Sequence, residues 1–357
     1  MRITEIQCHR LPVTTLLPAI PRNLIEYTLV RVLTDEGIDG NYIVWSETPA
    51  ARPQALAEGL RQMRPYLIGC DPLLIEHIWQ KLGKMWYEEK GPAFAAIDCC
   101  LWDIAGKKAN LPVYKLLGGA REEILAYASG EPPKTMEGKV ELAKELKARG
   151  YHASKVHPFT MEECEAVRRA VGDEHILMHD AIFALDFPTA LKVGRKLEEL
   201  DFYWYEAPLP ARDIEGYIEL SRRLSIPVTV ELRNSFHEYM RRGAVRIMRS
   251  VSDFTGGITE MHKIATLCEF YGVKYEPHSF GGAYTQMANL HVMLSIEHCD
   301  FFELPLIEGK EGALDAGVLK GIRIDERGYV KPFDQPGLGL EIDWDMVKTG
   351  ESYRLDW

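Results

Sequence analysis

The sequence lacks features that would assign it to several specialised classes of protein. No stretch approaches the roughly 20 consecutive apolar residues that a membrane-spanning helix requires, and no long apolar segment follows Met1. The seven cysteines are scattered, odd in number and without a C-x-x-C pair or a zinc-type spacing. We therefore expect reduced thiols, no membrane association and a cytoplasmic location.

Basic residues are fewer than acidic ones, 42 against 53, and the formal net charge is -11. This balance argues against a nucleic-acid partner, because such surfaces need clustered Lys and Arg. It leaves an anionic substrate open, since a bound divalent cation would invert the local field. With 46% hydrophobic and 27% charged residues in 357, the chain is typical of a globular protein with two domains, or of a barrel with an attachment.

The first third of the chain combines strands with helices. Residues 26–33 are rich in β-branched and apolar side chains and lead into a turn at residues 35–37, which predicts a hairpin. Apolar residues then recur at helical spacing between residues 55 and 119, where Gly118 and Gly119 end the pattern. We expect an α+β domain at residues 1–119.

From residue 120 onward a strand-then-helix pattern repeats. Eight short apolar runs begin near residues 124, 153, 176, 202, 228, 247, 273 and 301. From the second run on, each closes at an ionisable residue, and these lie 22 to 26 residues apart: Lys155, Asp180, Glu206, Glu231, Asp253, His278 and Glu303. Such an interval fits one strand, loop and helix, so the repeat predicts a (β/α) barrel in which these side chains meet at the carboxyl ends of the strands.

The barrel accounts for residues 120–320. Little room for another full helix remains after Glu303, and residues 321–357 are rich in turns. We expect this tail to return to the N-terminal block, so that both ends of the chain build a cap over the barrel.

Several longer motifs carry a resemblance to a known family. They are AAIDCCLWDIAGK at 95–107, LPVYKLLGG at 111–119, WYEAPL at 204–209, DFTGGIT at 253–259, EPH at 276–278 and PGLG at 336–339. Over essentially its whole length the chain resembles the mandelate racemase and muconate lactonizing enzyme family of the enolase superfamily, in the mandelate racemase subgroup. The resemblance implies a modified (β/α)7β barrel of the TIM type with an α+β capping domain.

The resemblance also implies a metal centre. The third, fourth and fifth strand ends of the family supply three carboxylates, which here are Asp180, Glu206 and Glu231. Hard oxygen ligands favour Mg²⁺, with Mn²⁺ as a possible substitute. The proton beside a carboxylate is weakly acidic, and a cation on the carboxylate oxygens stabilises the enediolate that forms when this proton is removed.

Two further pairs resemble the proton-transfer groups of the family. Lys155 and His157 lie two apart on a strand and can share a face. The family usually has Lys-x-Lys here, which implies that Lys155 stabilises the enolate charge. His157 could be the base, a hydrogen-bond donor to a substrate hydroxyl, or a residue that has lost the role. Asp253 and His278 resemble a dyad in which the carboxylate orients the imidazole.

The last expectations concern the substrate. Glu303 resembles a carboxylic acid that donates to the substrate carboxylate. Specificity in the family comes from cap loops, which makes Arg22, Asn23 and Trp86 candidates for substrate binding. We expect a small carboxylic acid as partner and a homo-oligomer.

Three functional readings remain open at this point. The first is dehydration of an acid sugar to a 2-keto-3-deoxy acid by a lyase. The second is racemisation or epimerisation of a small 2-hydroxy or amino acid derivative by an isomerase. The third is a catalytically silent relative, which the altered Lys-x-His motif keeps open.

Overall fold

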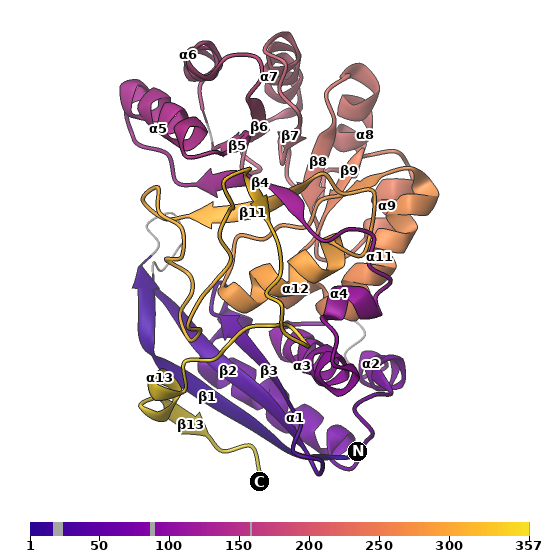
Figure 1. Cartoon of the computed structure of the whole chain (residues 1–357). Coiled ribbons are helices and arrows are strands. Elements are labelled where there is room, and N and C mark those ends of the chain that lie inside the picture. Colours follow the sequence, from indigo (N-terminus) through magenta and orange to yellow (C-terminus); the bar gives the residue numbers. More distant parts are fainter. Residues whose placement is uncertain (17–23, 86–89, 158, 357) are drawn as a thin grey trace.

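The computed structural model describes residues 1–16, 24–85, 90–157 and 159–356, which form an α+β unit beside a barrel of parallel strands (Figure 1). Both termini lie in the α+β unit, in the lower part of the figure, and we call this unit the cap. Its elements are β1 (Ile3–Leu16), β2 (Leu24–Thr34), β3 (Asp39–Trp45), the 3-10 helix η1 (Pro49–Ala51), α1 (Pro53–Leu67), α2 (Ile75–Gly83), α3 (Pro92–Ala109), α4 (Val113–Leu116), α13 (Trp344–Lys348) and β13 (Glu351–Tyr353).

The cap contains a four-stranded antiparallel sheet in the order β13-β1-β2-β3. Strands β2 and β3 pair from Leu33 opposite Asp39 onward, so the predicted hairpin is confirmed. Its turn contains Gly37 at φ +73°, a conformation that glycine adopts without steric cost. Because β13 pairs with β1, the end of the chain returns to the cap.

Helix α3 packs directly on this sheet. Its N-terminus carries Pro92, and its C-terminus ends at Asn110 in the left-handed conformation. The helix approaches β3 so closely that a Cβ at Gly40 would lie 2.0 Å from the carbonyl oxygen of Cys100. Glycine is therefore required at this contact, and α3 is buried on nearly all sides.

Eight parallel strands form the barrel. They are β4 (Ile124–Gly130), β5 (Ala153–Val156), β6 (Ile176–Asp180), β7 (Tyr205–Glu206), β8 (Val228–Glu231), β9 (Ile247–Arg249), β10 (Lys274–Tyr275) and β11 (Phe301–Leu306). The helices between them are α5 (Met136–Ala148), α6 (Met161–Val171), α7 (Phe187–Glu199), α8 (Ile214–Arg223), α9 (Phe236–Arg241), α10 (Ser252–Thr255), α11 (Gly257–Tyr271) and α12 (Ala283–Met293). The strands follow one another from β4 to β10, with β11 beside β4, and the antiparallel β12 (Tyr329–Val330) also pairs with β4. The predicted (β/α)7β barrel with an α+β cap is confirmed.

The barrel closes between β10 and β11 through one backbone bond and one side chain. The N–H of Tyr275 donates to the carbonyl of His298 at 2.9 Å. The carboxylate of Glu276 accepts from the N–H groups of Asp300 and Phe301 at 2.8 and 3.1 Å. The side chain of Glu276 thus supplies hydrogen bonds that a longer strand pair would otherwise provide.

The sixth strand differs from the prediction. We expected the run that starts at Ile247 to end at Asp253, but β9 ends at Arg249 and Asp253 lies in the short helix α10. The prediction that Asp253 closes this strand is wrong, because the strand is only three residues long. Arg249 occupies the strand end instead, in register with Glu231 of β8.

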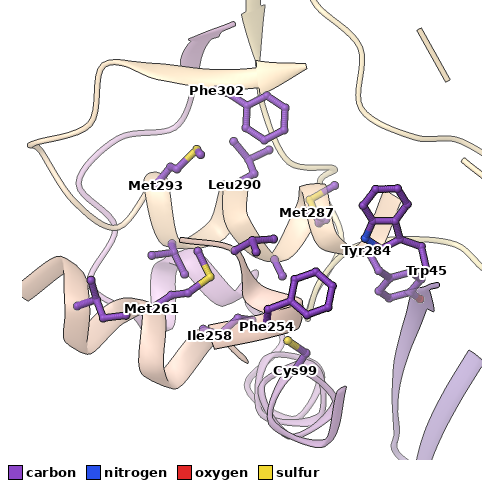
Figure 2. Packing of buried hydrophobic residues seen from close by; sticks show 14 of the residues in the cluster. Trp45, Cys99, Phe254, Ile258, Met261, Tyr284, Met287, Leu290, Met293 and Phe302 are labelled. Atoms are coloured by element: carbon purple, nitrogen blue, oxygen red, sulfur yellow. The ribbon is translucent and has the colours of Figure 1, made fainter. Parts of the chain in front are cut away.

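The cap and the barrel share one hydrophobic core. Figure 2 shows Cys99 of α3 beneath Ile258 and Met261 of α11, and Met287 and Leu290 of α12 above them. Burial of such side chains stabilises the contact by about 25 cal/mol per Å² of apolar surface. The described helices include none with the length and apolar character of a membrane span.

Candidate active site

The carboxyl ends of the barrel strands gather acidic and basic side chains. Asp180 and Glu206 lie opposite each other in the β6–β7 register, so their side chains share a face of the sheet. The ammonium of Lys155, at the end of β5, lies 3.2 Å from Oε2 of Glu206 and 3.6 Å from Oδ2 of Asp180. Asp180 and Glu206, which the repeat predicted to lie near Lys155, thus both contact the Nζ atom of Lys155.

Two cations and two carboxylates form a closed ring at this end of the barrel. Lys155 Nζ lies 3.2 Å from Glu206 Oε2 and 2.9 Å from Glu303 Oε1. The guanidinium of Arg249 lies 3.0 Å from the other oxygen of Glu206 and 2.8 Å from the other oxygen of Glu303. Each carboxylate therefore bridges both cations, and we call these four residues the charge ring.

The contacts within the ring shift the pKa values of Lys155 and Glu303. Burial alone would lower the pKa of Lys155, but the carboxylates of Glu206 and Glu303 outweigh it and hold this pKa well above its ordinary value. Burial opposes ionisation of Glu303, yet Lys155, His278 and Arg249 outweigh burial and hold its pKa well below the ordinary value. An ionised Glu303 has no proton to give, which differs from the expected donor to the substrate carboxylate.

His157 follows β5 and lies beside the ring. Its Nε2 is 3.6 Å from Oδ2 of Asp180. Burial and the neighbouring Lys155 lower the pKa of His157 to about 3, so the imidazole is neutral at physiological pH. A neutral imidazole has one nitrogen free to accept a proton.

His278 approaches the ring from the loop after β10. Its Nδ1 lies 3.0 Å from Oε2 of Glu231, and its Nε2 lies 3.8 Å from Oε2 of Glu303. Asp253, the expected dyad partner, bonds elsewhere. The structure thus pairs His278 with the carboxylate at the end of β8, which sequence reasoning had assigned to the metal.

Asp253 connects the barrel to the cap. One carboxylate oxygen accepts from the hydroxyl of Tyr42 of β3, and the other accepts from the hydroxyl of Thr285 of α12, both at 2.6 Å. Burial raises the pKa of Asp253 to about 6, although hydrogen bonds from Thr285, Tyr42 and Trp45 act in the opposite direction. These contacts show Asp253 as a link that holds β3 over the strand ends.

The three expected metal ligands have donor chemistry that fits a hard divalent cation. Among the described residues, however, no three Asp, Glu, His or Cys side chains are arranged to enclose an ion. Asp180 and Glu206 share the ammonium of Lys155, while Glu231 lies against His278. Because one cationic nitrogen already contacts oxygens of Asp180 and Glu206, these two carboxylates face a common point. Carboxylate oxygens are the ligands that Mg²⁺ prefers.

A cleft of about 680 Å³ opens beside the end of β8 and is lined by Glu231 together with Glu47, Arg212 and Arg233. Burial, followed by the charge of Glu231, raises the pKa of Glu47 to about 7. The lining of the cleft thus contains the expected metal ligand Glu231 together with a second acid and two arginines.

Three of the predicted site residues lie outside the described part of the chain, and two residues of the site were not predicted from the sequence. Arg22, Asn23 and Trp86 lie outside the described residues. Sequence reasoning missed Arg249 and Tyr42. The sequence held a signal for Arg249, because this charged residue directly follows the apolar pair Ile247 and Met248. It held no local signal for Tyr42, which is 211 residues from its partner Asp253.

Comparison with known proteins identifies relatives along the whole chain. A family model described as the N-terminal domain of mandelate racemase and muconate lactonizing enzyme matches residues 4–118. A second model, described as enolase C-terminal domain-like, matches residues 139–346. The two models together match the cap and the barrel.

Curated relatives include dehydratases of sugar acids. The chain is 31% identical over 346 residues to the arabinonate dehydratase of Saccharolobus solfataricus, covering 90% of each chain. It is 30% identical to the D-galactonate dehydratase of Cronobacter sakazakii, covering 100% of this chain and 96% of the relative. These relatives are lyases.

Solved structures agree with this comparison. D-glucarate dehydratase from Agrobacterium tumefaciens, complexed with magnesium, is similar with a TM-score of 0.86 and 28% identity, covering 99% of this chain and 100% of that one. The 3,6-anhydro-D-galactonate cycloisomerase from Zobellia galactanivorans has a TM-score of 0.84 and 28% identity, covering 98% and 99%. The similarity extends over both cap and barrel.

Proposed function

Because the chain belongs to the mandelate racemase and muconate lactonizing enzyme family of the enolase superfamily, we propose that it dehydrates an acid sugar to a 2-keto-3-deoxy acid. The reaction would begin with removal of the proton beside the substrate carboxylate. The observation that carries the proposal is the meeting of Lys155, Asp180 and Glu206, from the ends of three barrel strands, with Glu303, which lies inside β11.

Asp180, Glu206 and Glu231 would hold a Mg²⁺ ion, or Mn²⁺ in its place. When bound, the ion supplies positive charge that makes the adjacent C–H bond more acidic and stabilises the enediolate. The magnesium in the similar glucarate dehydratase structure supports this choice of ion.

Lys155 would stabilise negative charge on the substrate. Its side chain is 2% exposed and its ammonium is held by carboxylates, so it is charged over the physiological range. A fixed cation in a buried site acts on a developing oxyanion more strongly than it would in water.

His157 would accept the proton. It follows the same strand as Lys155, and its side chain is 17% exposed, so a bound substrate can reach it. Because the imidazole is neutral, a ring nitrogen can take up a proton, but the pKa of about 3 makes His157 a weak base in the free protein.

His278 would protonate the departing hydroxyl. Its Nδ1 lies 3.0 Å from Glu231 and its Nε2 lies 3.8 Å from Glu303, so the imidazole is held between two carboxylates beside the ring. Water would leave with this proton, and the resulting enol would rearrange to the keto acid.

The cleft beside Glu231 would receive the rest of the sugar chain. Its lining of Glu47, Arg212 and Arg233 offers hydrogen-bond partners for hydroxyl groups. The names of the arabinonate and D-galactonate dehydratases support a polyhydroxylated acid as substrate.

Racemisation or epimerisation is the second candidate. The two histidines come from different parts of the barrel, His157 after β5 and His278 after β10, so proton removal and proton return could use separate groups. In this reaction His278 would return the proton to carbon instead of giving it to a leaving hydroxyl.

An NMR assay in D₂O distinguishes the readings. The protein is incubated with Mg²⁺ and a panel of mono- and diacid sugars, and the spectra are followed with time. A keto product formed with loss of water supports dehydration. Deuterium at the α-carbon with inverted configuration would favour the isomerase, and absence of both with every acid would favour a silent relative.

A further inference from the structure

Arg249 is the most deeply buried cation of the site. Its side chain is 0% exposed, and it extends from the end of β9 to Glu206 and Glu303. Besides its two carboxylate contacts, Nη2 donates to the hydroxyl of Tyr127 at 3.1 Å. The guanidinium carbon also lies 5.1 Å from the ring centroid of Trp204, which covers one face. The group is therefore held on several sides and cannot swing toward solvent.

Arg249 contacts one carboxylate oxygen of each of two acids, Glu206 and Glu303. Glu206 turns Oε1 to Arg249 and Oε2 to Lys155, and Glu303 turns Oε2 to Arg249 and Oε1 to Lys155. The backbone N–H of Ser279 also donates to Oε2 of Glu303 at 3.1 Å. Each acid thus has one oxygen held by Arg249 and the other oxygen in contact with Lys155.

An arginine suits this task better than a lysine. The guanidinium is planar, remains charged, and presents several N–H groups in a fixed fork that can hold two carboxylates at once. A lysine ammonium is a single point of charge on a flexible stem, so it could contact both acids only by leaving their oxygens less well defined. Arg249 also cannot exchange protons with the substrate, because it does not lose its proton in proteins.

We propose that Arg249 is a positioning residue of this active site, which fixes the orientation of Glu206, an expected metal ligand, and of Glu303, and balances the charge of both acids. This inference rests on the proposed function, since it takes Glu206 as a metal ligand. In this role Arg249 would act through the two carboxylates and not by its own contact with a metal or with the reacting atoms.

The test uses the substitution Arg249→Lys, which keeps the positive charge but removes the fork. Binding of Mn²⁺ alone is measured by electron paramagnetic resonance of the free ion, and thermal unfolding reports whether the variant is folded. We expect folded protein with Mn²⁺ affinity lowered by about tenfold or more, the range found when partners of metal ligands are removed. With a substrate identified by the acid-sugar panel, kcat should fall more than KM changes.

Arg168→Lys is the matched control. Arg168 is also buried, but within the described part of the chain it donates to the backbone carbonyls of Gly172, His175, Leu200 and Asp201, away from the site. R168K should lower the melting temperature and leave Mn²⁺ affinity unchanged, which separates a loss of stability from a loss of positioning.

A second variant covers the case in which R249K does not fold. The pair Arg249→Met with Glu303→Gln removes one cation and one acid together, so that no extra buried charge remains unbalanced. We expect the pair to fold and still to bind Mn²⁺ at least about tenfold more weakly, because Glu206 has lost its fixed partner. E303Q alone serves as its reference.

The outcomes separate this inference from the proposed function. Wild-type affinity for Mn²⁺ in R249K or in the double variant, or a loss no greater than that of R168K, would overturn the role of Arg249. A wild-type protein that binds no Mn²⁺ would overturn the proposed function, and the positioning role with it.

Discussion

The Nδ1 atom of His278 lies 3.0 Å from Oε2 of Glu231, so the partner of this imidazole is the acid at the end of β8, two strands away from β10 in the barrel. In the arrangement expected from sequence, the partner is Asp253. In the structure, both carboxylate oxygens of Asp253 instead accept hydrogen bonds from hydroxyl groups, one in the cap and one in α12. The two acids therefore have different tasks, and substitution can separate them.

The first prediction compares Asp253→Asn with His278→Asn. D253N leaves one hydroxyl of the pair Tyr42 and Thr285 without its acceptor, so the free energy of unfolding should fall by about 1–3 kcal/mol. Its kcat should remain within about tenfold of the wild type, whereas H278N should lose about 10²- to 10⁴-fold, the contribution of a general acid. Steady-state kinetics and urea unfolding measure both effects. A D253N variant as inactive as H278N would contradict the assignment.

The second prediction concerns His157. If this imidazole takes the proton, His157→Asn should slow exchange of the substrate α-proton in D₂O by about 10²- to 10⁴-fold. Binding of Mg²⁺ should be retained, because His157 is not among the expected ligands. The exposed His152 provides the control substitution, His152→Asn. Unchanged exchange in H157N would assign proton removal to another group.

The third prediction uses the charge ring. Lys155→Met removes the ammonium that contacts Asp180, Glu206 and Glu303, and it leaves Arg249 as the one cation of the charge ring. The free energy of unfolding of the metal-free variant should therefore be about 3–5 kcal/mol lower than that of the wild type. Mg²⁺ would replace the missing positive charge. The melting temperature of K155M should therefore rise more on addition of Mg²⁺ than that of the wild type. An equal rise in both proteins would show that Lys155 and the ion do not act on the same acids.

The fourth prediction is a pH dependence of stability that arises at the closure of the barrel. Burial raises the pKa of Glu276 from 4.5 to about 7. The folded state therefore holds this proton more tightly than the unfolded state, and stability is full below pH 4.5 and falls as the pH rises through about 7. The loss is at most about 3 kcal/mol for a shift of this size.

Glu276→Gln removes this titration. Urea unfolding at pH 5 and pH 8 should show a smaller decrease in E276Q than in the wild type. Glu297→Gln, at a side chain that is 80% exposed, controls for the substitution itself. Parallel curves for E276Q and the wild type would show that Glu276 does not titrate in this range.

The fold could be predicted from the sequence because its signals are local. Apolar runs followed by helical stretches recur at a nearly constant interval, and β6 and β8 begin and end at the predicted residues. The positions of Lys155, Glu206 and Glu303 follow from the same repeat, since parallel strands bring their carboxyl ends to one face.

The partners of these side chains could not be predicted in the same way. Asp253 lies at nearly the right interval, yet one turn of helix carries it away from the strand end and toward Tyr42. Arg249 was overlooked because it lies only 18 residues after Glu231, whereas Asp253 fits the repeat of 22 to 26 residues. Contacts between residues far apart in the chain depend on how the cap packs on the barrel, and a local pattern does not contain that information.

The central claim is that Asp180, Glu206 and Glu231 together bind one divalent cation. Calorimetric titration of Mg²⁺ into the protein tests it most directly, with Glu231→Gln as the informative variant and Glu311→Gln as control, since Glu311 pairs with Arg149 and Tyr151 instead. We expect one Mg²⁺ per chain in the wild type and in E311Q, and an affinity lowered by about tenfold or more in E231Q. A wild-type protein that binds no Mg²⁺, or an E231Q variant that binds it equally well, would contradict the account.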